Sequence, residues 1–134
     1  MNQTLIKNIN IWTMDERDSR FFGWILLENN RIASMGEGEP PTMSVMIDGD
    51  VIDGEGGVLT PGLIDIHSHI GLYEDGLGFE GADGNEDTDP ATPHLRALDG
   101  VNPFDRSFRE ALEAGVTAAA VSPGSANPIG GQIA

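Results

Sequence analysis

Residues 58–70 read VLTPGLIDIHSHI, an apolar run that ends in two histidines separated by one residue. The β-branched and apolar residues predict a strand that is buried on both faces, as in a parallel sheet. Side chains alternate along a strand, so His67 and His69 point to the same side, about 6.6 Å apart along the strand. Two imidazoles at that spacing can lean together and bind one metal ion at about 2.0–2.1 Å.

Asp65 lies on the same predicted face, one step before the two histidines. We expect its carboxylate to accept a proton from a ligand imidazole or to bind the metal itself. Functional sites of parallel α/β folds lie at the carboxyl ends of strands, and the histidines stand at such an end. A bare His-x-His pair is a weak signal, because histidines also occur as structural residues. The strand and Asp65 together favour a metal site.

The residues after this strand predict one further strand, reached through a loop and a helix. The loop covers about residues 70–103, with seven acids between Glu74 and Asp89, and loops of this length are more often functional or disordered. Asn102 or Asp105 can cap the helix, Gly115 ends it, and 116–121 is a second buried strand. The helix carries one apolar stripe, made of Phe104, Phe108, Ala111 and Leu112. This order predicts the βα-β unit of a parallel sheet, and so an α/β fold.

Residues 1–57 predict a separate all-β module of roughly five short strands, divided by glycine and proline turns. The clearest signal is Asn29-Asn30 between two apolar runs, because asparagine tolerates the positive φ of a tight two-residue hairpin turn. The chain therefore divides into a β module at 1–57 and an α/β part at 58–134.

The charge of the chain restricts its partners. The 134 residues include 22 acidic and 7 basic residues, which gives a net charge of -15. Such a charge repels nucleic acid and disfavours an anionic membrane surface, so we expect neither partner. Solubility is the plain explanation of the acidity, and a field that attracts cations is the alternative. The absence of cysteine excludes disulfides and thiolate metal sites. With no signal-peptide pattern and no apolar run of about 18 residues, we expect a cytoplasmic protein.

Three residues in the loops are candidate substrate contacts. His94 either approaches the site from the long loop, as a substrate contact or third ligand, or bonds to backbone carbonyls. Arg96 either binds a substrate carboxylate or balances nearby acids, which we favour. Asn127, in the stretch PGSANPIGGQ, either shapes a pocket or belongs to a glycine- and proline-rich turn.

The stretch VIDGEGGVLTPGLIDIHSHI at 51–70 resembles the start of the amidohydrolase superfamily of metal-dependent hydrolases. Members of that family place a His-x-His pair at the end of the first barrel strand, after a PGxID turn. Residues 71–105 and 115–132 resemble a branch close to imidazolonepropionase-like and prolidase-like members. The resemblance covers most of the chain, but it does not fix a substrate.

The resemblance implies a small β-sandwich segment, followed by the first βα-β unit of an incomplete TIM barrel. It implies a homo-oligomeric hydrolase that acts on small molecules and cleaves carbon–nitrogen bonds other than peptide bonds. In the mechanism that the resemblance implies, a metal ion activates water and an aspartate moves the proton to the leaving nitrogen. His67 and His69 are the residues that match the family's ligands. The implied cofactor is a divalent metal, zinc first, with manganese or iron as alternatives.

The family's remaining ligands lie on later strands: a carboxylated lysine or glutamate, two histidines and the catalytic aspartate. Here the only lysine is Lys7, no histidine follows His94, and a complete barrel takes about 250 residues. We therefore expect an N-terminal portion of a longer enzyme, with no catalytic residue beyond the metal half-site and no activity by itself. The alternative is a non-catalytic truncated fragment that pairs with itself or complements another chain through its free strand edges.

Overall fold

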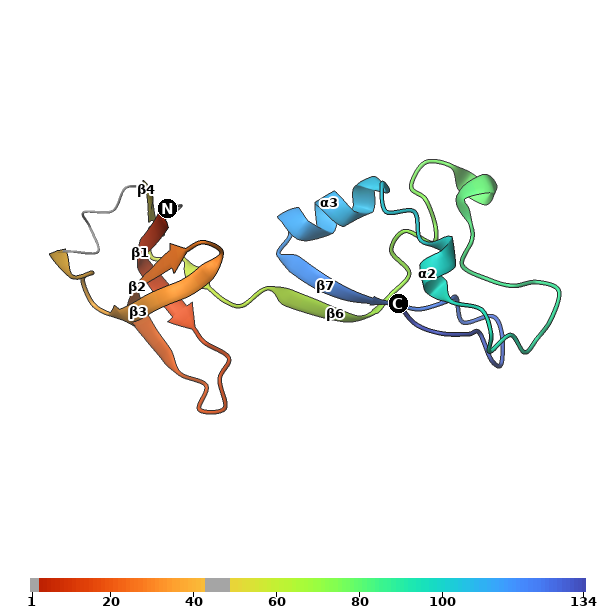
Figure 1. Cartoon of the computed structure of the whole chain (residues 1–134), viewed down its shortest axis with the longest axis horizontal. Helices are drawn as coiled ribbons and strands as arrows, with labels where there is room; N and C mark the ends of the chain where they lie inside the picture. The colour runs from red at the N-terminus through yellow and green to blue at the C-terminus, as the bar shows by residue number, and fades with distance from the viewer. Residues whose placement is uncertain (1–2, 43–48) are drawn as a thin grey trace. The chain divides into compact units, whose positions relative to one another are not determined.

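The computed structural model describes residues 3–42 and 49–134. The chain forms two compact units, Met1–Pro61 and Gly62–Ala134 (Figure 1). The division lies a few residues after the predicted boundary at 57, because Val58–Leu59 forms a short strand, β5, that pairs with the first strand of the chain. No helix among the described residues is long and apolar enough to cross a bilayer.

Within its described residues, the first unit is one sheet in the order β3-β2-β1-β4, with β5 also paired to β1. Strands β1 to β3 are antiparallel neighbours, whereas β4 and β5 run parallel to β1. The strands other than β5 are β1 (Gln3–Trp12), β2 (Arg20–Glu28), β3 (Arg31–Glu37) and β4 (Gly49–Asp53). The predicted β module is present as this sheet, and a β-sandwich stays a prediction.

The predicted hairpin turn at Asn29-Asn30 is confirmed. Both residues have positive φ, 48° and 64°, and they connect β2 to β3. A two-residue hairpin turn of this kind matches the right-handed twist of the flanking strands, and asparagine reaches this conformation at lower cost than most residues.

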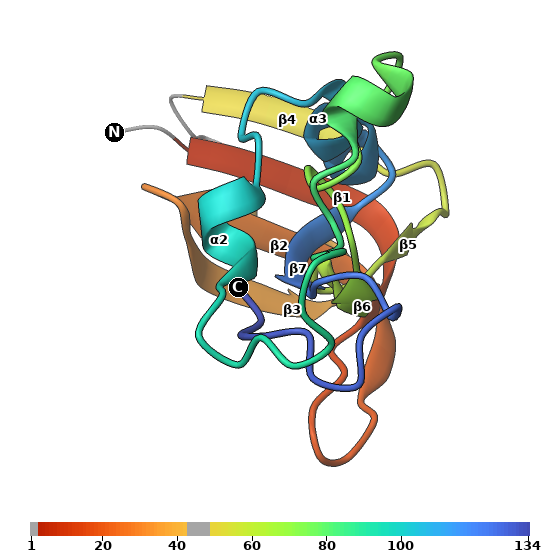
Figure 2. The ribbon, with the colours of Figure 1, turned by 90° about the vertical axis from the view of Figure 1, so that its right-hand side faces the viewer.

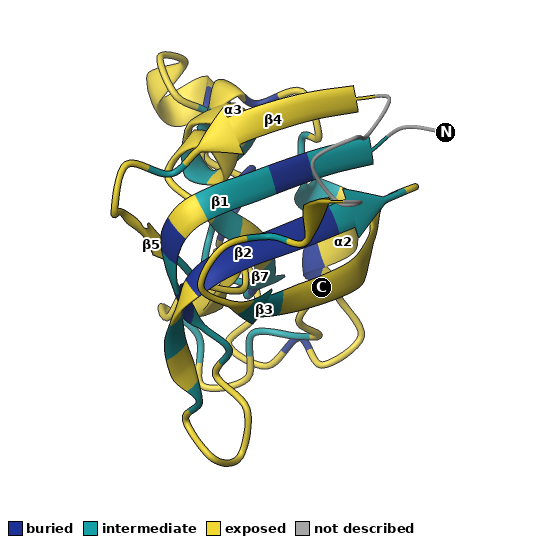
Figure 3. Cartoon of the chain, turned by 90° about the vertical axis from the view of Figure 1, so that its left-hand side faces the viewer, coloured by how far each residue is buried: buried dark blue, intermediate teal, exposed yellow. Residues whose placement is uncertain are grey.

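A bulge in β1 gives the sheet of the first unit two small apolar cores. The register of β1 against β2 shifts between Ile6 and Ile9, where Asn8 has φ 57°. An extra residue reverses which side of the sheet the later side chains face. One core therefore contains Leu5, Trp24 and Leu26, and the other contains Ile9, Ile11 and Ile25. Figure 3 shows the buried positions of this unit concentrated on β1 and β2.

The second unit is built on two parallel strands, β6 (Leu63–Ser68) and β7 (Val116–Val121). Between them lie the 3-10 helix η1 (Gly78–Gly81) and the helices α2 (Ala97–Gly100) and α3 (Arg106–Glu113). The predicted strand–helix–strand order and the parallel pairing are thus confirmed, while a TIM barrel stays a prediction. The chain as a whole is a mixed α/β protein, mostly strands.

The burial predicted for the strands of the second unit is wrong for this chain. Leu63, Ile64 and Ile66 on β6 are exposed, Ile66 by 84%, and β7 is buried only at Val121. Among the described residues β6 has one neighbouring strand, so its apolar side chains have little to pack against. The core lies instead beyond the strands' carboxyl ends, where Leu72 and Ala97 pack with Val121.

Asp105 is the N-cap of α3, as predicted. Its Oδ1 accepts hydrogen bonds from the backbone N–H and the hydroxyl of Ser107, at 2.8 and 2.6 Å, and its Oδ2 accepts one from the N–H of Asp75. These bonds, those of Ser107 first, lower the pKa of the buried Asp105 carboxyl. Gly115, with φ 92°, follows the helix.

The lowered pKa of Asp105 predicts a loss of stability in acid. Because the folded pKa lies below the ordinary value of 3.8, the unfolded chain binds the proton more tightly. The contribution of Asp105 to the free energy of unfolding is therefore complete at neutral pH, and it is lost as pH falls through 3.8 toward the folded pKa. Asparagine caps helices equally well but does not titrate. In urea titrations followed by circular dichroism, Asp105→Asn should lose less stability than the wild type between about pH 7 and pH 3. Equal losses would contradict this role.

Candidate metal half-site

The two histidines singled out in the sequence lie at the carboxyl end of β6. His67 is the last residue but one of the strand and His69 follows its end. Beside them the chain leaves β7 at Ser122, whose N–H donates a 2.8 Å hydrogen bond to the carbonyl of Ser68. Figure 2 shows the second unit from the side that carries the loops after β6 and β7. The parallel pairing thus brings the residues after both strands to one edge.

The imidazoles of His67 and His69 are neighbours. Their ring centroids lie 5.3 Å apart, and the ring planes are inclined by 80°. His67 is exposed and His69 is half-buried. The pair is therefore close enough to supply two nitrogen donors to one site, and one of the two rings is open to solvent.

The orientation of His69 is set by a hydrogen bond to the backbone. Its Nδ1 lies 2.7 Å from the carbonyl oxygen of Ser122. A carbonyl oxygen only accepts, so Nδ1 carries the hydrogen and donates it. In the neutral ring this leaves the lone pair on Nε2, which is the arrangement that a histidine ligand of a metal requires.

Asp65 contacts the strand backbone. Its Oδ1 accepts a 3.1 Å hydrogen bond from the N–H of His67, and the side chain is exposed. The carboxylate is thus bound to the backbone of His67 rather than to an imidazole. Its predicted support of a ligand stays a prediction.

The donors at this edge fit half of a metal site. Among residues 3–42 and 49–134, no group of three or more His, Cys, Asp or Glu is placed to hold an ion. Two imidazoles, one with its Nδ1 hydrogen already bound to a carbonyl, are nitrogen donors of the kind that zinc accepts. The pair therefore fits a divalent ion, but it supplies only two of the ligands.

The long acidic segment after β6 is tied to the segment after β7. Asn127 donates from Nδ2 to the carbonyls of Glu86 and Asp89, at 2.8 and 2.9 Å. The N–H of Thr92 donates to the carbonyl of Ile129. The predicted loop is therefore an ordered structure, and the amide nitrogen of Asn127 is used to hold it.

Arg96 is paired with an acid of the same segment. Its guanidinium donates to both carboxylate oxygens of Asp99, from Nε at 2.9 Å and from the terminal nitrogen at 2.5 Å. This hydrogen bonding raises the pKa of Arg96 and lowers that of Asp99. His94 is exposed, and its charge makes a small contribution to the lowered pKa of Glu86, which comes mainly from the hydrogen bonds of Thr88.

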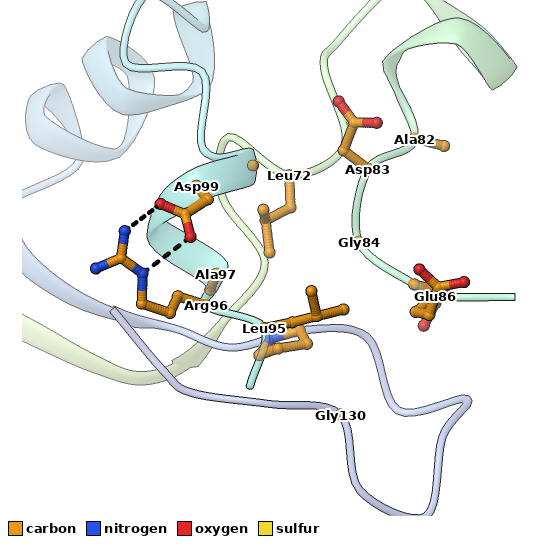
Figure 4. Close-up of a pocket in the computed structure, with 13 residues that line it drawn as sticks. Leu72, Ala82, Asp83, Gly84, Glu86, Leu95, Arg96, Ala97, Asp99 and Gly130 are labelled. Atoms are coloured by element: carbon orange, nitrogen blue, oxygen red, sulfur yellow. Dashed lines mark hydrogen bonds and ion pairs between the residues drawn. The ribbon is translucent and has the colours of Figure 1, made fainter. Parts of the chain in front are cut away.

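A cavity of about 460 Å³ lies within the second unit. Figure 4 shows the Arg96–Asp99 pair on one side of Leu72 and Leu95, and Asp83 and Glu86 on the other side. Acids outnumber bases among the lining residues, which are Leu72, Ala82, Asp83, Gly84, Asn85, Glu86, Leu95, Arg96, Ala97, Asp99, Gly100, Pro123 and Gly130.

Sequence reasoning missed Tyr73, which packs against His69, and two residues that contact Tyr73. The ring of Tyr73 stands edge-on to that of His69, with centroids 6.0 Å apart. Asn85 donates from Nδ2 to the Tyr73 hydroxyl at 2.8 Å, and Gly124 lies against both side chains. They lie far apart in the sequence and belong to no motif, so no sequence pattern indicated them.

No family model matches the sequence. Two curated proteins are similar to it. "Amidohydrolase tasK" of Hapsidospora irregularis is 36% identical over 146 residues, which is 96% of this chain and 14% of that protein. "Imidazolonepropionase" of Treponema denticola is 36% identical over 53 residues, which is 40% of this chain and 13% of that protein. The chain thus spans a small part of the length of these relatives.

Solved structures are similar to this chain as well. An amidohydrolase from Thermotoga maritima MSB8 is 43% identical with a TM-score of 0.77, and the match covers 97% of this chain and 32% of that one. An enamidase, described as a member of the amidohydrolase superfamily, is 26% identical with a TM-score of 0.52, over 87% of this chain and 24% of its own.

Proposed function

Because the chain belongs to the amidohydrolase superfamily and spans a portion of its longer relatives, we propose that it serves metal-dependent hydrolysis. The bonds cleaved are carbon–nitrogen bonds other than peptide bonds, in small-molecule substrates. The observation that carries the proposal is the pair His67 and His69 at the end of β6, with rings 5.3 Å apart and Nδ1 of His69 bound to the carbonyl of Ser122.

In this proposal the pair holds a divalent ion through ring nitrogens, Nε2 in the case of His69. A bound ion of this kind, zinc first, with manganese or iron as alternatives, polarises the scissile carbonyl or imine and lowers the pKa of water. Asp65, whose carboxylate accepts from the N–H of His67, would support the site as a hydrogen-bond acceptor or as a further ligand. In this proposal the chain itself supplies two ligands of the ion, His67 and His69.

The rest of the chemistry is proposed to come from residues outside this chain's half-site. A site that activates water keeps about three protein ligands and one open position, and the described residues bring only two donors together. We propose that β6 and β7 are the first two strands of a barrel, with residues 58–134 its start and 1–57 a β-sandwich segment. A carboxylate from a later strand would move the proton to the leaving nitrogen.

Arg96 is the proposed contact for an anionic group of the substrate, since its side chain lines the cavity of the second unit. Such a group would compete with Asp99 for the guanidinium. His94 and Asn127 stay predictions as substrate contacts; the Asn127 amide nitrogen is already occupied by two carbonyls.

The experiment that tests the proposed half-site is a zinc titration of the chain. Because the sequence holds three histidines, their imidazoles can be followed one by one in nuclear magnetic resonance spectra. Zinc should perturb His67 and His69 together, and perturbation of neither would reject the site.

A second candidate role is association through β6, without catalysis by this chain. It is favoured by one observation, the exposed apolar side chains of Ile64 and Ile66 on a strand with one paired neighbour among the described residues. Unpaired strand edges and apolar patches promote pairing with a second copy or with another chain. In native mass spectrometry we expect dimers or larger species, and Ile64→Lys with Ile66→Lys should shift them to monomer. A monomeric wild-type chain would reject self-association.

A further inference from the structure

We propose that the turn after β7, residues 122–124, positions His69 as a ligand before any metal is bound. The turn does so by selecting the tautomer of the imidazole and by holding Tyr73 against the ring. As a statement about metal binding this inference rests on the proposed function, whereas the tautomer itself can be measured without metal.

The first contribution to the positioning of His69 comes from the backbone of Ser122. Its N–H is bound to the carbonyl of Ser68 and its hydroxyl lies 3.4 Å from the same oxygen, so the residue is fixed to the end of β6. Its carbonyl accepts from Nδ1 of His69 at 2.7 Å. A neutral histidine in water favours the hydrogen on Nε2. The carbonyl reverses that preference and leaves Nε2 as the free donor.

The second contribution comes from the ring of Tyr73. It stands at 81° to the ring of His69, with centroids 6.0 Å apart, which is an edge-to-face contact. The hydroxyl of Tyr73 accepts a hydrogen bond from Nδ2 of Asn85, so the far end of the ring is also held. His69 is therefore limited by the Ser122 carbonyl, by Tyr73 and by the neighbouring His67 ring.

The third contribution comes from Gly124, which lets the turn approach Tyr73 and Asn85. Its N–H donates to the carbonyl of Gly84. A Cβ at this position would lie 2.2 Å from Oδ1 of Asn85 and 2.6 Å from the hydroxyl of Tyr73. Either the two side chains or the turn itself would have to move. A side chain at this position is therefore disfavoured by space rather than by backbone conformation.

His67 provides an internal comparison. It is exposed, and among residues 3–42 and 49–134 its imidazole has no hydrogen bond in the structure, only the ring contact with His69. Its tautomer should therefore follow the preference of a free side chain. The two histidines of one motif are thus predicted to differ in the metal-free chain.

The test is to record imidazole nitrogen spectra of the metal-free, ¹⁵N-labelled chain in alkaline solution, where imidazoles are neutral. We expect the Nδ1–H form to dominate at His69 and the Nε2–H form at His67. A dominant Nε2–H form at His69 would overturn the proposal. If the tautomers are as expected but zinc does not bind, the positioning stands and the proposed function fails.

Gly124, in the turn, and Gly130, outside it, give a matched pair of variants. Gly124→Ala should lower the Nδ1–H share of His69 and weaken zinc binding by roughly 10- to 100-fold, as for loss of a residue that supports a ligand. Gly130→Ala should change neither, because its Cβ would meet Pro123 at an ordinary 3.5 Å. Tyr73→Phe keeps the ring but removes the hydroxyl that Asn85 binds, so it should act in the same direction as Gly124→Ala. It is the second variant to use if Gly124→Ala does not fold. Unchanged tautomer and affinity in both variants would overturn the proposal.

Discussion

Replacing His67 and His69 by alanine is expected to abolish zinc binding in a longer protein that also contains the part of the relatives that this chain does not span. Such a protein can be made by substituting residues 1–134 for the matching segment of the Thermotoga maritima amidohydrolase, which is 43% identical over 97% of this chain. Loss of two ligands should weaken binding by more than the roughly 10- to 100-fold cost of losing a residue that only supports a ligand. Metal content after gel filtration measures the effect.

The matched control for this experiment is His94→Ala. His94 is the third histidine of the chain and is exposed, and no cluster of three ligands forms among the described residues. Zinc content should therefore stay at the wild-type level in this variant. Undiminished zinc in the double variant, or equal loss in the control, would show that the pair is not the metal site.

The second large effect concerns turnover by the 134-residue chain alone. Two imidazoles without a third ligand hold an ion weakly, and among the described residues no group of three or more possible ligands is placed to hold an ion. We expect turnover of amides, lactams and other carbon–nitrogen substrates, with zinc added, at least about 1,000-fold below the 10 per second of a typical enzyme.

A measured rate near that typical value would contradict this expectation. It would mean that two histidines suffice, or that association of several chains assembles a complete site. Dilution of the sample separates these outcomes, since a site shared between chains loses activity as the chains dissociate.

Local patterns predicted the elements of this protein well. The pair Asn29-Asn30 predicted its turn because few residues tolerate the positive φ that both positions adopt. Asp105 predicted the start of α3 because its carboxylate can accept from backbone N–H groups that the helix leaves free. The βα-β order followed in the same way from the spacing of apolar residues between 102 and 121.

Features that depend on distant residues were not predictable. The apolar run before His67 has the composition of a strand buried on both faces, but burial depends on neighbours, and β6 is exposed here. The contact of His69 with Ser122 joins residues 53 positions apart, and it exists because β6 and β7 end at one edge. The folded loops bring together Tyr73, Asn85 and Gly124, which are far apart in the sequence. No spacing in the sequence could therefore predict their contact.

A zinc titration of the ¹⁵N-labelled chain, with its three imidazoles followed separately, tests whether His67 and His69 are two ligands of one metal site. We expect both imidazoles to change together and to saturate at one zinc per pair, while His94 does not change. Zinc that leaves the pair unperturbed, or that acts first on His94 or the acidic loop, would contradict it.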